Sequence, residues 1–181
     1  MTTRTEATIE DLYKVEGKAE LVNGEIVLMP PTGFMPSFAG GEIFASLREY
    51  ARRTKRGYAI TDGAGFTVKL PNRGSFCPDV AFYTGPPTGG KFMQGAPAFA
   101  VEVRSAGDYG PKQEEEMAKK RADYFAAGTQ VVWDVDVLRR EEIRVYRASD
   151  PETPKVYRRG ERAEAEPALP GWTLAVDDLF P

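Results

Sequence analysis

The hydrophobic positions of the chain repeat with two different periods. In two long stretches, apolar residues recur at the spacing that places them on one face of a helix. The first stretch carries Ile43, Leu47 and Tyr50, and the second covers residues 113–127 and ends at Gly128, a residue type that favours helix C-caps. The pattern therefore predicts two long helices.

Short runs of β-branched and aromatic residues lie before and after the second helix. Such runs, bounded by glycine, proline or polar residues, are typical of strands. The predicted strands cover residues 58–60, 66–70, 80–83, 98–103, 130–135 and 142–146. We predict a loop over the Gly/Pro-rich segment 85–97, and a polar, partly disordered segment over residues 158–167.

The N-terminal part of the chain predicts two smaller elements. Thr8 and Asp11 have the spacing of a capping box, which begins a short helix that Gly17 is expected to end. The pair Asn23-Gly24 lies between two apolar runs and predicts a β-hairpin, because both residue types tolerate the positive φ angles of a type I′ turn.

Strands interleaved with two long helices predict an α/β (α+β) fold. We expect a mixed β-sheet flanked by helices, with the N-terminal β-hairpin joined to the first long helix by a loop over residues 29–36. The chain has 181 residues, of which 41% are hydrophobic and 28% charged, enough for one domain with a substantial core. A single domain over residues 1–181 is therefore expected.

Two carboxylates interrupt the apolar pattern of the predicted strands. Glu102 lies in the middle of one apolar run, and Asp79 directly precedes another. An ionised group in such a position costs several kcal/mol unless it is paired or binds a metal. Asp79 could also be an ordinary turn residue, and Glu102 could form a structural ion pair with Lys120 or Arg121.

Several cations compete for a position beside these carboxylates. Arg104 lies two residues after Glu102, on the same face of the strand, but it stays protonated and could contact phosphate without acting as a base. Lys120 lies beside the buried stripe of the second helix, from which its ammonium could reach the carboxylates. Arg121 lies closer to the centre of that stripe, and Lys119 points farther outward. Lys120 could also be an ordinary surface lysine.

Two carboxylates with a lysine nearby are the parts of a metal-dependent site that cleaves phosphodiesters. Divalent ions held by carboxylates neutralise the phosphate, activate a water and stabilise the leaving alkoxide. Asp79 and Glu102 would supply ligand oxygens, the backbone carbonyl of Val103 could add another, and Lys120 would orient or deprotonate water or stabilise charge. Oxygen ligands of this kind suit magnesium, manganese or calcium.

Missing residue types exclude other chemistries. The chain has no histidine and a single cysteine, Cys77, which excludes Ser-His and Cys-His nucleophiles, an intrachain disulfide and cysteine-rich or histidine metal sites. No stretch approaches the roughly 18 apolar residues of a membrane span. The N-terminus lacks the apolar stretch of a signal peptide. A cytoplasmic protein without a membrane partner is expected.

The formal net charge of −3 does not by itself indicate a nucleic-acid partner. Five cations nevertheless lie within residues 48–56, among them Arg52, Arg53, Lys55 and Arg56. A stripe of this kind can follow a phosphate backbone. A solvated helix end, whose cations favour the C-terminal dipole, accounts for it equally well.

Taken together, the motifs resemble those of the Uma-two family of restriction-type endonucleases, in the PD-(D/E)XK nuclease superfamily. The matching segments span nearly the whole chain: Glu20-Leu-Val-Asn-Gly-Glu25, Met29-Pro-Pro31, Pro78-Asp79, Glu102-Val-Arg-Ser105, Lys120-x-x-x-Tyr124-x-x-x-Gly128, Val132-Trp133-x-Val-Asp136, and Leu169-Pro-Gly followed by Leu179-Phe180. The resemblance implies a restriction-endonuclease-like core, a magnesium or manganese ion at Asp79 and Glu102, DNA as the substrate, and a homo-oligomer.

The resemblance also implies roles for further residues. In this family the lysine that the superfamily carries on a strand has moved to the helix, which favours Lys120 over Arg104. Glu20 matches an acidic position of the family and is expected to contribute from the N-terminal region. Family members often carry a histidine after the Pro-Pro loop, where this chain has Pro36-Ser37.

Three functions follow from these observations. The leading one is a magnesium- or manganese-dependent endodeoxyribonuclease. The alternative is a catalytically degenerate module that binds nucleic acid or self-assembles. The missing histidine, Arg104 at the usual lysine position and the acidic composition favour this interpretation. A third is a hydrolase that uses the same metal site on a phosphoester smaller than DNA.

Overall fold

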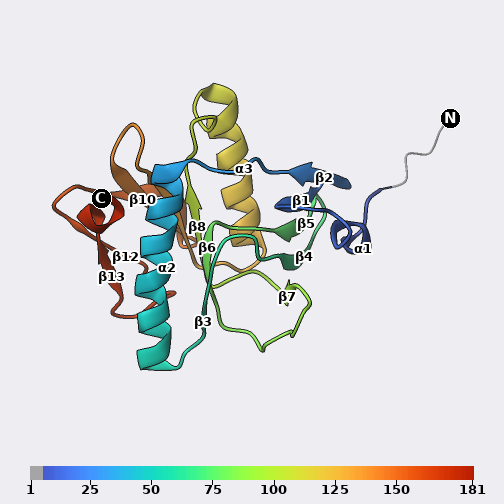
Figure 1. Cartoon of the computed structure of the whole chain (residues 1–181), viewed down its shortest axis with the longest axis horizontal. Helices are drawn as coiled ribbons and strands as arrows, with labels where there is room; N and C mark the ends of the chain where they lie inside the picture. The colour runs from blue at the N-terminus through green and yellow to red at the C-terminus, as the bar shows by residue number, and fades with distance from the viewer. Residues whose placement is uncertain (1–5) are drawn as a thin grey trace.

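The computed structural model of the chain describes residues 6–181 (Figure 1). The described strands form three sheets: a six-stranded sheet, a five-stranded sheet and a two-stranded ribbon. The fold class is α+β, with mixed sheets flanked by helices, in agreement with the sequence prediction. None of the helices in the described part of the chain is long and apolar enough to cross a membrane.

The six-stranded sheet forms the centre of the molecule, with the strand order β11-β10-β9-β8-β6-β3. Only β8 and β9 run parallel, and the other neighbouring strands are antiparallel. Its strands are β3 (Tyr58–Ile60), β6 (Val80–Tyr83), β8 (Phe99–Val103), β9 (Val131–Asp136), β10 (Glu142–Arg147) and β11 (Asp150–Arg158).

The five-stranded sheet lies to one side of the central sheet, with the order β2-β1-β5-β4-β7 (Figure 1). Within it, only β4 and β7 run parallel. Its strands are β1 (Ala19–Val22), β2 (Glu25–Leu28), β4 (Phe66–Leu70), β5 (Arg73–Phe76) and β7 (Met93–Gln94), and the separate ribbon pairs β12 (Arg162–Glu164) with β13 (Thr173–Ala175).

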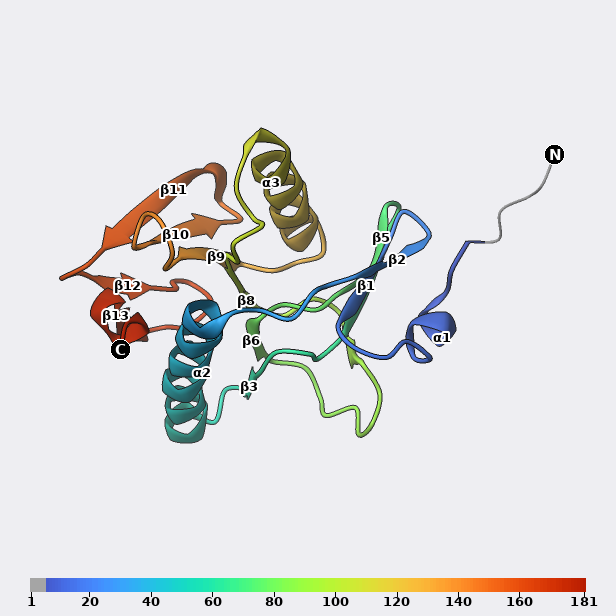
Figure 2. The same cartoon turned by 45° about the horizontal axis from the view of Figure 1, so that its top comes forward.

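Two long helices, α2 (Phe34–Thr54) and α3 (Pro111–Ala126), cover opposite faces of the central sheet (Figure 2). Successive strand residues point to opposite faces, so alternate positions of β8 contact different helices. Phe99 and Val101 belong to the cluster that α2 packs against, whereas Ala100 belongs to the cluster that contains Tyr124 of α3. Two hydrophobic layers therefore hold the sheet between the helices.

Most of the predicted elements are confirmed. The capping box of Thr8 and Asp11 begins α1 (Ile9–Leu12), and Asn23 and Gly24 have φ angles of 51° and 71° in the turn between β1 and β2. The strands predicted at residues 58–60, 66–70 and 80–83 have the expected bounds. The capping box, the Asn-Gly turn and the apolar runs thus identify elements whose conformation depends mainly on neighbouring residues in the chain.

Several boundaries were wrong. α1 ends at Leu12, well before Gly17, and α2 begins at Phe34, inside the segment predicted to be a loop. Pro36 fits there because the first turn of a helix does not use its backbone N–H as a donor. Residues 158–167, predicted to be partly disordered, instead contain β12, which pairs with β13.

Candidate active site

Asp79 and Glu102 come together because β6 and β8 are antiparallel neighbours. Val80 pairs with Val101, and the backbone N–H of Asp79 donates to the carbonyl of Val101 at 3.1 Å. Glu102 follows directly and points to the same face of the sheet as Ala100, toward α3. The register of these two short strands therefore places both carboxylates at the same end of the β6–β8 pair.

Asp79 is held by both of its carboxylate oxygens. Its Oδ2 accepts the backbone N–H of Val103 at 2.7 Å, and its Oδ1 lies 2.5 Å from the ammonium of Lys18. The same ammonium lies 2.7 Å from Oδ1 of Asp62. Asp79 therefore has more contacts than a turn residue needs, and it lies directly beside the backbone of Val103.

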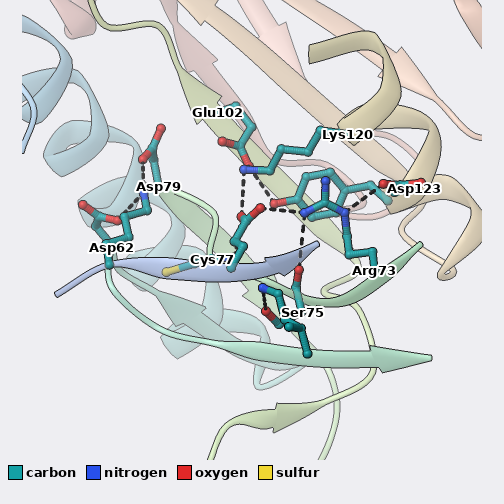
Figure 3. Close-up of polar contacts among 12 residues, drawn as sticks. Asp62, Arg73, Ser75, Cys77, Asp79, Glu102, Lys120 and Asp123 are labelled. Carbon is teal, nitrogen blue, oxygen red and sulfur yellow. Dashed lines mark hydrogen bonds and ion pairs between the residues drawn. The ribbon is translucent and has the colours of Figure 1, made fainter. Parts of the chain in front are cut away.

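Lys120 connects two carboxylates across the site (Figure 3). Its Nζ lies 2.9 Å from Oε1 of Glu102 and 2.9 Å from Oε1 of Glu20. Tyr124, one helical turn farther along α3, donates its hydroxyl to the same Glu102 oxygen at 2.7 Å. Within residues 6–181, no protein group bonds to the second oxygen of Glu102, Oε2.

Glu20 anchors the five-stranded sheet to the site. It lies on β1, is only 3% exposed, and accepts the guanidinium of Arg73 at 2.6 Å and the backbone N–H of Cys77 at 2.8 Å. Arg73 in turn donates to Asp123 on α3 at 2.8 Å. The resulting ion-pair network joins β1, β5 and α3 around Lys120.

The charges within this group perturb one another. Burial raises the pKa of Glu102, and the carboxylates of Asp79 and Glu20 raise it further, so that it stays above its ordinary value in spite of Lys120. Burial also raises the pKa of Glu20, but Lys120 and Arg73 outweigh it and hold that pKa low. The site therefore disfavours the negative charge of Glu102 and favours that of Glu20.

The lysines respond in the opposite sense. Burial lowers the pKa of Lys120, but Glu102 and Glu20 raise it above the ordinary lysine value. The pKa of Lys18 is raised in the same way by Asp79 and Glu102. Cys77 takes no part as a thiolate, because burial raises the pKa of its thiol to about 11.

Asp79 and Glu102 are the two carboxylates to compare with the predicted metal site. No three carboxylate or thiol side chains within residues 6–181 are arranged around one point as metal ligands. The oxygens of Asp79 and Glu102 are held by ammonium groups, so cations already occupy the positions next to them. The two carboxylates offer oxygen atoms, the ligand type that magnesium and manganese prefer. Glu102 makes its contacts with Lys120 and Tyr124 through Oε1, whereas the ammonium of Lys18 occupies the position beside Oδ1 of Asp79.

The remaining predicted residues lie elsewhere. The guanidinium of Arg104 bonds both oxygens of Asp134 at 2.7 Å and also contacts Glu114, so these two carboxylates, rather than Asp79 and Glu102, use its donors. Arg121 lies over the ring of Tyr146, 3.7 Å from its centroid, rather than beside Glu102. Of the ion pairs proposed for Glu102, the one with Lys120 is present.

The basic cluster lies at the C-terminal end of α2, around the predicted residues Arg52, Arg53, Lys55 and Arg56. Arg53 lies over the ring of Tyr50, and Lys55 is the C-cap residue. This cluster is far along β6 from Asp79, so the structure does not bring it together with the carboxylates.

Sequence analysis missed several residues of the site. Lys18 and Asp62 gave no signal because their contact with Asp79 joins segments far apart in the chain. Tyr124 was given no role in the sequence analysis. Its ring stacks on Phe76, with centroids 4.0 Å apart, and its hydroxyl contacts Glu102. Its position four residues after Lys120 was the one available signal.

Comparison with known proteins bears on the fold and the family of the chain. A crystal structure described as that of a putative nuclease from Anabaena variabilis is similar in fold, with a TM-score of 0.75 and 18% sequence identity over 96% of this chain and 97% of that one. No curated protein matches the sequence. The model of a family described as "Putative restriction endonuclease" matches residues 7–177. The chain therefore belongs to the Uma-two family of putative restriction endonucleases.

Proposed function

We propose that the protein is a divalent-metal-dependent endonuclease that hydrolyses phosphodiester bonds of DNA. One observation carries the proposal: Asp79, directly before β6, lies beside the end of β8 that carries Glu102, and Lys120 lies 2.9 Å from Glu102. Membership of a nuclease family supports the reaction class. Magnesium or manganese, the choice of DNA, and the role of each residue are part of the proposal.

Asp79 and Glu102 would hold the metal through carboxylate oxygens, with the carbonyl of Val103 as a further ligand. When bound, a divalent ion supplies charge neutralisation on the phosphate and activation of the attacking water. Glu102 can offer Oε2 without breaking a contact, because Lys120 and Tyr124 both bond Oε1.

Lys120 is suited to orient water and to stabilise developing negative charge. Its two carboxylate neighbours raise its pKa, so it remains an ammonium and donates hydrogen bonds. Tyr124 fixes the position of the Glu102 carboxylate, and Glu20 fixes that of the Lys120 ammonium. Preorganised donors of this kind contribute most where charge develops in a site shielded from water.

Cleavage of DNA by Lys120→Met tests this role. We expect plasmid and genomic DNA, which present many sequences, to be cut by the wild type in magnesium or manganese and not in EDTA. The variant should cleave about a hundredfold more slowly while it still binds manganese, because it loses a charge-stabilising donor but no metal ligand.

Lys119→Met is the matched control for that experiment. Lys119 is the exposed neighbour of Lys120 and pairs with Glu115 at 2.6 Å. Equal rates in both lysine variants would contradict the role of Lys120. No cleavage by the wild type under any metal condition would favour the degenerate binding module, in which Lys18 and Lys120 pair with the carboxylates in place of a metal.

Lys18 provides a second prediction, on metal affinity. Its ammonium neutralises Asp79 at the position that a metal would approach, so Lys18→Met should tighten manganese binding by about tenfold or more, as expected for removing a unit charge a few ångströms away. Isothermal titration of manganese measures the change. Lys14→Met removes an exposed ammonium and should have no effect, and unchanged or weaker binding in Lys18→Met would show that Lys18 does not compete with the ion.

A further inference from the structure

A basic hollow lies at the opposite end of β6 from Asp79. It has a volume of about 640 Å³, and its lining includes Arg48, Arg52, Lys55 and Arg56 at the end of α2. The lining also includes Thr84, directly after β6. Asp79 and Thr84 are separated by five residues, or about 16 Å of extended chain at a strand's rise per residue.

The four cations of this basic hollow have no carboxylate partner among the described residues. By contrast, the cations around the active site, such as Lys18, Lys120 and Arg73, all form ion pairs. The dipole of α2 favours cations in its last turn. It does not account for Arg48, which lies farther back along the helix on the same wall.

Gly57 brings the chain after α2 into contact with β6. A Cβ at this position would lie 2.5 Å from the backbone oxygen of Tyr83 and 2.7 Å from the ring of Phe82. Because only glycine allows this approach, Lys55 and Arg56 are fixed close to the strand end. Gly57 itself lines the hollow together with these cations.

An exposed aromatic ring completes the lining. Tyr58 lies on β3, the edge strand of the central sheet, and is 48% exposed. Its side chain makes no ring contact or hydrogen bond to any residue within 6–181. Cations that bind phosphates, together with an open aromatic face on which a base can stack, are the combination found in sites for single-stranded nucleic acid.

We propose that the basic hollow binds a single-stranded segment of nucleic acid, with phosphates on Arg48, Arg52, Lys55 and Arg56 and one base stacked on Tyr58. The proposed function supplies only the class of ligand; the site itself rests on the lining of the hollow. A concave surface with one aromatic ring suits a strand better than a membrane, which binds a broad apolar face. The hollow is then a second contact for the substrate, separate from the metal ligands.

The proposal is tested by the binding of a labelled single-stranded oligonucleotide. Fluorescence anisotropy measures this binding in EDTA over a series of salt concentrations. The double variant Arg52→Ala/Arg56→Ala should bind more weakly, and the slope of log affinity against log salt should fall by about 1.4, or roughly 0.7 for each lost phosphate contact. Tyr58→Ala should bind about fivefold to a hundredfold more weakly with an unchanged slope, whereas Tyr58→Phe should bind like the wild type.

The double variant Arg158→Ala/Arg159→Ala is the matched control. It removes the same charge from a surface where both arginines pair with carboxylates, and it should retain the wild-type slope. The proposal would be overturned if both double variants lost the same affinity for the oligonucleotide, or if the wild type did not bind it at low salt. Binding to anionic lipid vesicles in place of the oligonucleotide would also overturn it.

Failure here is distinguishable from failure of the proposed function. EDTA prevents metal-dependent cleavage, so binding through the hollow is measured whether or not the protein is a nuclease. If binding depends on Arg52 and Arg56 but the protein never cleaves DNA, only the proposed nuclease function is contradicted. If the protein cleaves DNA but its binding does not depend on these residues, only the proposed binding site in the hollow is contradicted.

Discussion

Glu102→Gln is expected to abolish metal-dependent DNA cleavage and to leave the chain at least as stable as the wild type. The substitution removes a ligand charge but keeps an oxygen that can accept from Lys120 and Tyr124. Loss of a charge that holds a catalytic metal should lower the cleavage rate by about a thousandfold or more.

The effect on stability has the opposite sign. The folded chain raises the pKa of Glu102, through burial and the carboxylates of Asp79 and Glu20, so its ionised form opposes folding at neutral pH. Glutamine removes that cost. The gain in stability of Glu102→Gln over the wild type should be largest at neutral pH. It should shrink as the pH falls through the folded-state pKa of Glu102 toward the ordinary carboxyl value, because Glu102 of the wild type then takes up a proton.

Thermal unfolding and DNA cleavage, followed in parallel from pH 4 to pH 8, measure both parts of this prediction on the same preparation. Glu115→Gln, at an exposed position of α3, is the control, with no expected loss of cleavage. A Glu102→Gln variant that cleaves at the wild-type rate would remove Glu102 from the site. A variant that is inactive because it is unfolded would show that the carboxylate is structural.

Arg104→Met is expected to destabilise the chain by about 3–5 kcal/mol and to leave manganese binding unchanged. Arg104 is 2% exposed and makes a two-pronged contact with Asp134, which is 3% exposed. Removing one member of such a buried pair leaves the other charge uncompensated. For a domain of this size the melting temperature should fall by roughly 6–20 °C.

The double variant Arg104→Met/Asp134→Leu distinguishes an ion-pair role from a contact with phosphate. Replacing both members of a buried pair with apolar residues is often neutral, so most of the lost stability should return. Chemical unfolding of both variants and the wild type provides the free energies. A stable Arg104→Met protein with weakened DNA binding would contradict the structural role and restore the phosphate contact that the sequence suggested.

The parts of the site that the sequence predicted are those encoded by local patterns. Glu102 interrupts an apolar strand, and Asp79 directly precedes one, so both could be recognised from their neighbours. Lys120 could be placed beside the buried face of α3 by its spacing from Tyr124. These patterns indicate which side chains point toward the interior, and they required no knowledge of distant contacts.

The parts that were missed depend on pairing between distant segments. β5 (Arg73–Phe76) lacks a run of β-branched residues and forms a strand because it lies between β1 and β4. Lys18 and Asp62 become part of the site only when the five-stranded sheet lies beside Asp79. The direction of Arg104 was decided by Asp134 on the neighbouring parallel strand, a partner that spacing along β8 could not reveal.

Isothermal titration of manganese into the wild type, Asp79→Ala and Asp178→Ala tests the central claim most directly, since it requires no knowledge of the nucleic acid. Asp178 is an exposed carboxylate near the C-terminus and is the matched control. We expect one or two ions to bind per chain in the wild type and in Asp178→Ala, and none with comparable affinity in Asp79→Ala. Absence of binding up to millimolar manganese, or equal binding in all three proteins, would contradict a metal site at Asp79 and Glu102.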